Sequence, residues 1–153
     1  EAQLTMAGVP DQPGVASKIL GPITNANIEI DMIVQNVGAD GCTDFTFTVH
    51  RNDYDVAHEL LKKISVELGA KAVIGDDKIV KISLVGVGMR SQAGIANTMF
   101  QTLADENINI RMISTSEIKI SVVVDEKYLE LGVRSLHEAF GLDNDGQLSS
   151  LAG

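Results

Sequence analysis

The stretch Val9-Pro10-Asp11-Gln12-Pro13-Gly14-Val15-Ala16 holds the residue types best suited to chemistry in this chain. An apolar run from Leu4 to Val9 stops there at a turn, and an amphipathic segment follows. Asp11 can accept hydrogen bonds from the free amides that open a helix, and Pro13 is tolerated in a first turn because it lacks an amide proton. Gly14 allows a ligand or another backbone to come close. The stretch therefore predicts a strand, a loop and a helix start, which serves either as helix capping alone or as a cradle for a small ligand.

The same residue types suit a zwitterion, which needs acceptors for its ammonium group and donors for its carboxylate. Asp11 and backbone carbonyls can accept from the ammonium group, and the amides of Gly14, Val15 and Ala16 at a helix N-terminus can donate to the carboxylate. Gln35, at the end of the adjacent predicted strand, can bond a side-chain hydroxyl or amide. These residues predict a site for an α-amino acid.

The composition argues against several other kinds of function. The 153 residues are 44% hydrophobic and 22% charged, which is typical of a globular chain with a buried core. The net charge of −9 opposes binding to nucleic acid. Cys42 is the single cysteine, so no internal disulfide can form, and no Cys/His set has zinc-ligand spacing. No uncharged apolar run is long enough to span a bilayer, and we expect a cytoplasmic protein without metal or cofactor.

The first half predicts the element order βαββαβ. Apolar periodicity places strands at 4–9, 28–35, 45–49 and 71–74, and helices at 15–26 and 53–68. Pro22 is expected to kink or end the first helix, and Gly69 to stop the second.

The second half repeats the first at an offset of 80 residues, which is read from Gly14 and Gly94 and holds without a gap for about thirty residues. Later the offset falls to 74, so the first copy has the longer turn, around Gly38 to Gly41. Two domains are expected, 1–77 and 78–153. In the second copy we expect strands at 79–87, 110–114 and 118–124 and a closing helix at 127–140.

No fourth strand is expected in the second copy. Residues 141–146 contain too many turn formers for a strand in a sheet interior, and the tail after about residue 144 is expected to be weakly ordered. The missing strand is expected to have been lost by truncation or to come from a separate segment.

Two motifs resemble the regulatory region of aspartate kinase. The stretch from Asn107 to Val123, with Ser114-Thr-Ser-Glu-Ile inside it, follows Leu84-Val-Gly-Val-Gly-Met-Arg-Ser. The first half fits too, with Asp11-Gln-Pro-Gly and Ile28-Glu-Ile-Asp-Met-Ile-Val-Gln-Asn-Val. The resemblance covers nearly the whole chain. It implies two tandem ACT domains, α+β modules of ferredoxin-like fold that bind amino acids, either as the tail of a long kinase or as a separate regulatory subunit.

The resemblance also implies a function and partners. We expect a non-catalytic, allosteric module that binds threonine, either alone or in concert with lysine, and mediates feedback inhibition of an aspartate kinase catalytic domain or subunit. We also expect a homodimer of regulatory chains, in which the Asn109-Ile110 edge of another chain faces the first loop. The expected effector-binding residues are Asp11, Gln12, Pro13, Gly14, Val15, Ala16, Gln35, Asn109 and Ile110. Ser114, Thr115 and Glu117 are expected at an interface that reports ligand occupancy, with a solvated strand start as the other interpretation of Glu117.

The second loop departs from the pattern. At an offset of 80, Ser91 stands in the place of Asp11 and Ala93 in the place of Pro13, so the acid that would meet an ammonium group is gone. We therefore expect the second copy to act as a facing surface and not to bind an effector through its own loop. His50, His58 and His137 are scattered and are interpreted as surface residues.

Two other functions compete with this hypothesis. A catalytic ferredoxin-like enzyme would need a nucleophile or a base with an orienting partner, and the sequence holds no such set. A structural dimerisation domain with a vestigial site would keep the fold and lose effector binding.

Overall fold

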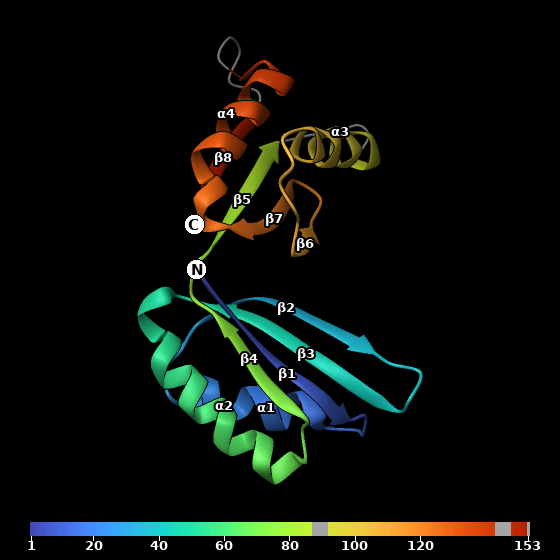
Figure 1. Ribbon diagram of the computed structural model, residues 1–153, viewed down its shortest axis with the longest axis vertical. Helices are drawn as coiled ribbons and strands as arrows, with labels where there is room; N and C mark the ends of the chain where they lie inside the picture. Colours follow the sequence, from blue (N-terminus) through green and yellow to red (C-terminus); the bar gives the residue numbers. More distant parts are fainter. Residues whose placement is uncertain (87–91, 143–147, 153) are drawn as a thin grey trace. The chain divides into compact units, whose positions relative to one another are not determined.

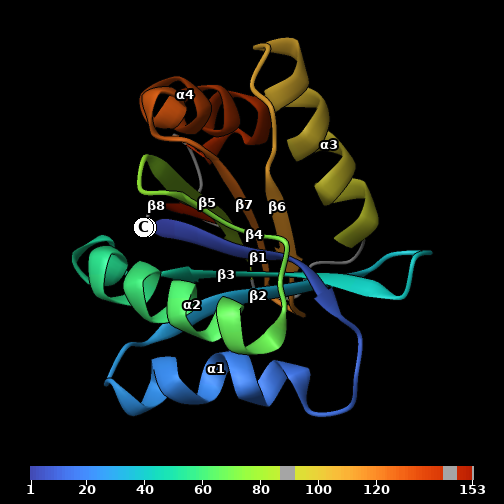
Figure 2. The ribbon, with the colours of Figure 1, turned by 60° about the horizontal axis from the view of Figure 1, so that its bottom comes forward.

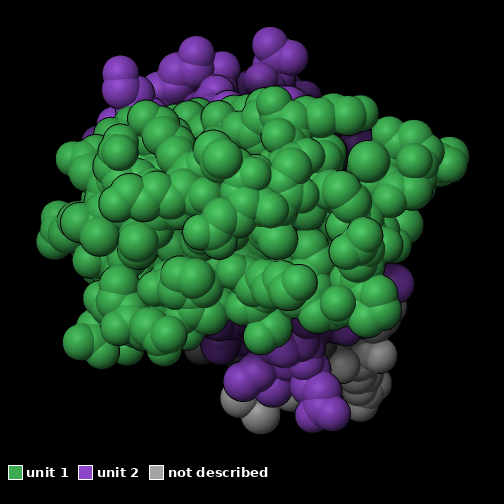
Figure 3. Space-filling model, turned by 90° about the horizontal axis from the view of Figure 1, so that it is seen from below, with its two compact units in different colours: residues 1–77 green, residues 78–153 purple. Residues whose placement is uncertain are grey.

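The chain was analysed as a computed structural model that describes residues 1–86, 92–142 and 148–152, the last as a strand backbone. It divides into two compact units, Glu1–Asp77 and Lys78–Gly153, which are coloured separately in Figure 3. Each unit is described by itself. Each holds one four-stranded antiparallel sheet, so the predicted α+β class is confirmed.

The first unit follows the predicted order βαββαβ (Figure 1). Its strands are β1 (Ala2–Pro10), β2 (Ile30–Val37), β3 (Cys42–Val49) and β4 (Ala72–Asp76), and its helices are α1 (Val15–Asn25), the 3₁₀ turn η1 (Arg51–Asp53) and α2 (Tyr54–Leu68). The sheet order is β2-β3-β1-β4. Gly69 ends α2 in the left-handed conformation, as predicted, whereas Pro22 lies inside α1, which continues to Asn25.

Helices α1 and α2 lie side by side on one face of this sheet (Figure 2). The core between them is aliphatic apart from Phe45 and Phe47, whose rings are 6.4 Å apart. Leu4, Ile19 and Leu61 are fully buried against them. Burial of such side chains contributes about 1.5–3 kcal/mol each. The opposite face is more polar, and there Thr5 and Thr46 share a hydrogen bond of 2.9 Å.

A β-bulge sets the direction in which β1 leaves the sheet. Met6 pairs with Phe45 and Val9 with Thr43, so Ala7 and Gly8 together oppose Asp44. Gly8 has a φ of 65° and donates its N–H to Asp44 Oδ1 at 2.8 Å. Bulges bend a strand and re-aim the residues that follow, so this one orients the loop that begins after Pro10.

The second unit repeats the arrangement. Its strands are β5 (Ile79–Gly86), β6 (Met112–Thr115), β7 (Lys119–Asp125) and β8 (Leu148–Ala152), and its helices are α3 (Gln92–Asp105), the 3₁₀ turn η2 (Glu126–Tyr128) and α4 (Leu129–Phe140). The sheet order is β6-β7-β5-β8, and α3 contacts α4. Details recur at an offset of 80, since Asn27 and Asn107 both have positive φ, of 61° and 59°.

The expectation of a missing strand in the second copy is wrong. Strand β8 pairs antiparallel with β5, from Ile82 opposite Ala152 to Gly86 opposite Leu148. Strand β8 begins at Leu148, which comes after the turn formers in the sequence, and an edge strand needs hydrogen bonds along one side only, so five residues suffice. The weakly ordered tail was expected to begin at about residue 144, and that start lies outside the described residues.

Candidate functional site

The loop between β1 and α1 is tied to the turn between β2 and β3. Pro10 pairs with Cys42, and the N–H of Asp11 donates to the carbonyl of Gly41 at 2.9 Å. Together with the bulge at Gly8, this bond fixes where the loop starts. The loop residues predicted as a site therefore leave the end of the interior strand β1 in a defined direction.

Helix α1 begins without a side-chain cap, so the predicted capping role of Asp11 is wrong. The N-cap is Gly14, with a φ of 88° and no side-chain hydrogen bond. Asp11 lies three positions before Gly14, and its own amide is committed to Gly41, so it does not occupy the capping position. Pro13 precedes the helix and does not lie in its first turn.

The loop leaves polar groups available to a ligand. The Asp11 carboxylate is exposed and has no hydrogen bond or ion pair within the described part of the chain. The amide of Val15, one of the three predicted carboxylate donors, is taken by the carbonyl of Gln12 at 3.1 Å. The amide of Ala16 has no such partner in the described ranges, and no acidic residue lies in the first turn. A Cβ on Gly14 would meet no atom within 4 Å, which leaves that side of the backbone open.

Gln35 lies at the same end of the sheet as this loop. It pairs with Phe45 on β3, and Phe45 also pairs with Met6 on β1. Directly opposed residues in an antiparallel pair point to the same face, so Gln35 points to the helix-covered face, as Phe45 does. Its side chain is exposed at the edge strand. The structure thus brings residues 11–16 and Gln35 to one end of one unit.

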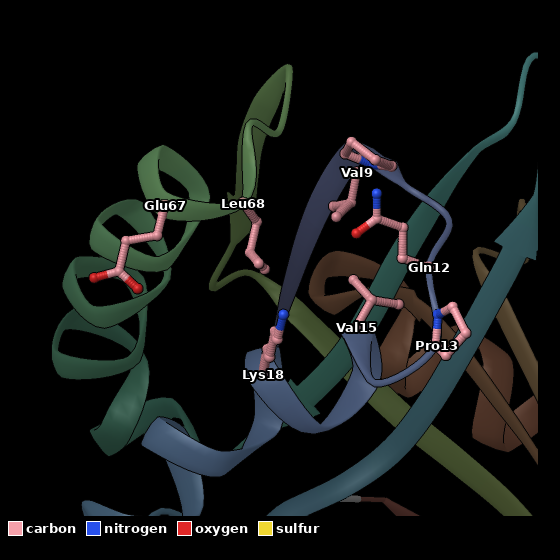
Figure 4. Close-up of a pocket in the computed structure, with 8 residues that line it drawn as sticks. Val9, Gln12, Pro13, Val15, Lys18, Glu67 and Leu68 are labelled. Carbon is pink, nitrogen blue, oxygen red and sulfur yellow. The ribbon is translucent and has the colours of Figure 1, made fainter.

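A cavity of about 180 Å³ opens on the other side of the loop, against the C-terminal turn of α2 (Figure 4). It is lined by Val9, Pro10, Gln12, Pro13, Val15, Lys18, Glu67 and Leu68. Three of these, Gln12, Pro13 and Val15, were predicted as site residues. Lys18, Glu67 and Leu68 were missed, because no sequence pattern links the first turn of one helix to the last turn of another 49 residues later.

Comparison with known proteins places both units in one family. The ACT domain family matches residues 3–69, and a second ACT domain family model matches residues 82–140. The aspartate kinase of Pseudomonas fluorescens strain SBW25 is 68% identical over 143 residues, which are 94% of this chain and 35% of that protein. The chain thus spans about a third of the length of the curated relatives that it matches.

Two solved structures are similar to this chain over nearly the whole length of both chains. A chain from the crystal structure of aspartokinase alpha and beta subunits is 55% identical, with a TM-score of 0.86 over 92% of this chain and 93% of that one. The ligand-free regulatory subunit of aspartate kinase from Thermus thermophilus is 38% identical, with a TM-score of 0.84 over 91% of each chain. The chain belongs to the aspartate kinase family, as a pair of regulatory ACT domains.

The second ACT domain holds its corresponding helix start in a different way. Helix α3 begins at Gln92, and the side-chain amide of Gln92 donates to the carbonyl of Ser116 in the turn between β6 and β7. Ser91, which stands where the first domain has Asp11, lies outside the described residues. The side chain of Gln92 is thus used for a contact within the domain.

The remaining predicted residues lie in the second ACT domain. Asn109 is exposed and Ile110 packs against that domain's core, both in the segment before β6. Ser114 and Thr115 are exposed on β6, and Glu117 is exposed in the turn that follows. Each ACT domain is described by itself, so the expected contacts of Asn109 and Ile110 with an effector at the first domain's loop stay a prediction.

Among residues 1–86, 92–142 and 148–152, no three His, Cys, Asp or Glu side chains gather as a metal site. No helix in the same ranges has the length and apolar character that crossing a membrane requires.

Proposed function

We propose that the first ACT domain binds a free amino acid at the loop between β1 and α1 and so regulates an aspartate kinase catalytic domain or subunit. The observation that carries this proposal is the unpartnered carboxylate of Asp11 beside an uncapped helix start. The loop supplies an acceptor for an ammonium group, and the first turn of α1, which follows it, supplies a donor for a carboxylate.

The proposed binding mode assigns each polar group of the ligand. The ammonium group meets Asp11 and neighbouring carbonyls, in a charge-assisted contact. The carboxylate meets the amide of Ala16 and the open backbone at Gly14, where the helix dipole favours negative charge. Gln35 bonds a hydroxyl or amide on the ligand side chain. Threonine fits this assignment, and lysine acting in concert is part of the proposal.

The proposal extends to assembly. Asn109 and Ile110 of a partner copy complete the site, and Ser114, Thr115 and Glu117 transmit its occupancy to the kinase. The active form is then a homodimer of regulatory chains in the cytosol. Because one ligand contacts two chains, binding and association are linked, and threonine must tighten the dimer.

Titration calorimetry with L-threonine, L-lysine, their mixture and a panel of other amino acids tests the function. Saturable binding of threonine supports it, and the absence of binding by the whole panel would leave a structural dimerisation module. Sedimentation at low protein concentration, with and without threonine, tests the assembly. Equal dimerisation constants would contradict the shared site and leave binding within one chain.

A further inference from the structure

The turn between β2 and β3 holds the dipeptide Asp40-Gly41, in which one residue can react with the other. The amide nitrogen of a glycine can attack the side-chain carboxyl carbon of a preceding aspartate, because glycine has no side chain to hinder the approach. Both residues are exposed, at the end of the sheet from which β1 also leaves (Figure 1). Gly41 has a φ of 79°, a conformation that favours glycine, so the turn itself requires this reactive pair.

The attacking and the attacked group are both accessible. The amide of Gly41 donates no hydrogen bond within the described residues, and a Cβ at Gly41 would meet no atom within 4 Å. The N–H of Cys42 donates to Asp40 Oδ1 at 3.0 Å, where it stabilises the negative charge that this oxygen gains during attack. Nζ of Lys71 lies 3.7 Å from Oδ2, so a proton can reach that oxygen through a water molecule.

The rearrangement needs no reactant other than water. The nitrogen of Gly41 forms a bond to Cγ of Asp40, the bond from Cγ to Oδ2 breaks, and Oδ2 leaves as water with the amide proton and a proton from Lys71. Water then opens the resulting succinimide ring at the backbone carbonyl carbon of Asp40, so that the chain continues through Cγ. The new α-carboxyl group releases a proton, which restores the charge of Lys71. Mass and oxidation state are unchanged, and the product is isoaspartate.

The same contacts make the reaction slow. The hydrogen bond from Cys42 and the charge of Lys71 lower the pKa of Asp40, so its carboxyl group is ionised at neutral pH. An ionised carboxylate resists attack by a nucleophile. The modification is therefore expected to accumulate with the age of the protein and not within a catalytic cycle.

Isoaspartate at this position would disturb the loop between β1 and α1. The carbonyl of Gly41 accepts the N–H of Asp11 at 2.9 Å, and the N–H of Gly38 donates to the carbonyl of Cys42 at 2.8 Å. The rearrangement adds the Cβ of Asp40 to the main chain and removes the carboxylate from the N–H of Cys42. The carbonyl of Gly41 is then displaced from the amide of Asp11.

We propose that Asp40-Gly41 is a site of spontaneous modification to isoaspartate, and that this change releases Asp11 from the turn and weakens effector binding. The second part rests on the proposed function, and the first does not. The site belongs to the first domain only, since the turn between β6 and β7 reads Ser116-Glu117-Ile118 and holds no Asp-Gly pair. Aged chains then respond less to threonine than newly made ones.

Peptide mapping of the folded chain after prolonged incubation at physiological pH and temperature tests the modification. The tryptic peptide 19–51 carries Asp31, Asp40 and Asp44, which electron-transfer fragmentation distinguishes. Isoaspartate is expected at Asp40 at a level at least about tenfold above that at Asp31 and Asp44, which precede bulky residues. The other Asp-Gly pair, at 145–146, falls in a separate peptide. A level at Asp40 no higher than at Asp31 and Asp44 would overturn the proposal.

Titration calorimetry with L-threonine and nuclear magnetic resonance of the Asp11 amide test the consequence. In chains rich in isoaspartate, affinity should fall about threefold to tenfold and the Asp11 resonance should shift, because one backbone hydrogen bond is lost. Treatment with protein isoaspartate methyltransferase and S-adenosylmethionine, which converts isoaspartate back to aspartate, should restore both.

Asp40→Glu is the matched control, because its longer side chain keeps the charge and would have to close a larger ring. Its affinity for threonine should be the same before and after incubation. An unchanged affinity and an unchanged Asp11 resonance in isoaspartate-rich wild-type chains would overturn the release of the loop. Absence of threonine binding in fresh chains would instead contradict the proposed function, while the peptide map and the Asp11 resonance would still decide the modification and the release.

Discussion

The two ACT domains share a scaffold and differ at the start of the helix that follows their first strand. Ile28 and Ile108 are 5% and 4% exposed, and Met32 and Met112 are both 6% exposed. The helix that follows the first strand begins differently in the two copies. In the first domain it starts at an uncapped Gly14 beside a free Asp11, whereas in the second the side chain of Gln92 is bonded to Ser116.

Under the proposed function, this difference assigns effector binding to the first copy of the repeat. The first loop leaves its acceptor and donor groups unused, and in the second a side chain of the helix start is consumed by a contact within the domain. Asp11 is exposed, so water satisfies its carboxylate when no ligand is bound, and a ligand with a complementary charged group can replace that water.

The largest effect is expected for Asp11→Ala. Loss of a charge-assisted contact to the ligand ammonium group should weaken threonine binding about tenfold to a hundredfold, which corresponds to about 1.5–3 kcal/mol. The fold should be unaffected, within about 0.5 kcal/mol, because Asp11 caps no helix in this structure. Calorimetry and chemical denaturation measure the two effects. Ser91→Ala is the control in the second domain, and unchanged affinity in a folded Asp11→Ala would remove Asp11 from the site.

Gly14 and Gly94 correspond to each other in the repeat, and their substitution by alanine should change the free energy of unfolding in opposite directions. Gly14 has a φ of 88°, so Gly14→Ala should destabilise the first domain by about 1–2 kcal/mol from backbone strain alone. Gly94 lies inside helix α3, where alanine is favoured, so Gly94→Ala should stabilise by up to about 1 kcal/mol. Urea denaturation of both variants checks the signs. A change of the same direction in both free energies of unfolding would contradict the difference between the two helix starts.

Gln12 and Gln92 also correspond to each other in the repeat, but only the side chain of Gln92 makes a hydrogen bond within its domain. Gln92→Ala removes the bond to Ser116 and should cost about 0.5–1.5 kcal/mol of unfolding free energy. Gln12→Ala removes no side-chain bond within the described residues and should be close to neutral. Denaturation midpoints of the two variants test this contrast, which equal losses would contradict.

The smallest effect concerns the longer turn of the first domain. The amide of Cys42 donates to Asp40, and Lys71 lies 3.7 Å away, so the pKa of Asp40 is lowered. A carboxyl group with a lowered folded-state pKa stabilises the fold above its unfolded pKa, and this contribution is lost as the pH falls through the folded value. Asp40→Asn should therefore lower the urea midpoint slightly at neutral pH and not in acid. Equal shifts in both conditions would show that the charge contributes nothing.

Much of the fold could be predicted because apolar periodicity determined it. The alternation along residues 28–35 and the helical spacing of Val15, Ile19 and Ile23 are local properties that burial then reinforces. The repeat helped further, since Asn27 and Asn107 mark the same left-handed position in both copies.

Other features could not be predicted, because they depend on register or on distant contacts. Strand β8 was missed since its pairing with β5 is a backbone property of an edge strand. The capping role of Asp11 failed because the bond from its amide to Gly41 places the helix start at Gly14. Lys18 and Glu67 line one cavity only because α1 and α2 pack together.

An exchange of loops tests the central claim most directly. The variant Asp11→Ser with Pro13→Ala gives the first domain the residues of the second, and Ser91→Asp with Ala93→Pro makes the reverse change. Calorimetry with L-threonine should show binding weakened at least about tenfold in the first variant and unchanged in the second. Full affinity in the first variant, or loss confined to the second, would contradict the assignment of effector binding to the first ACT domain.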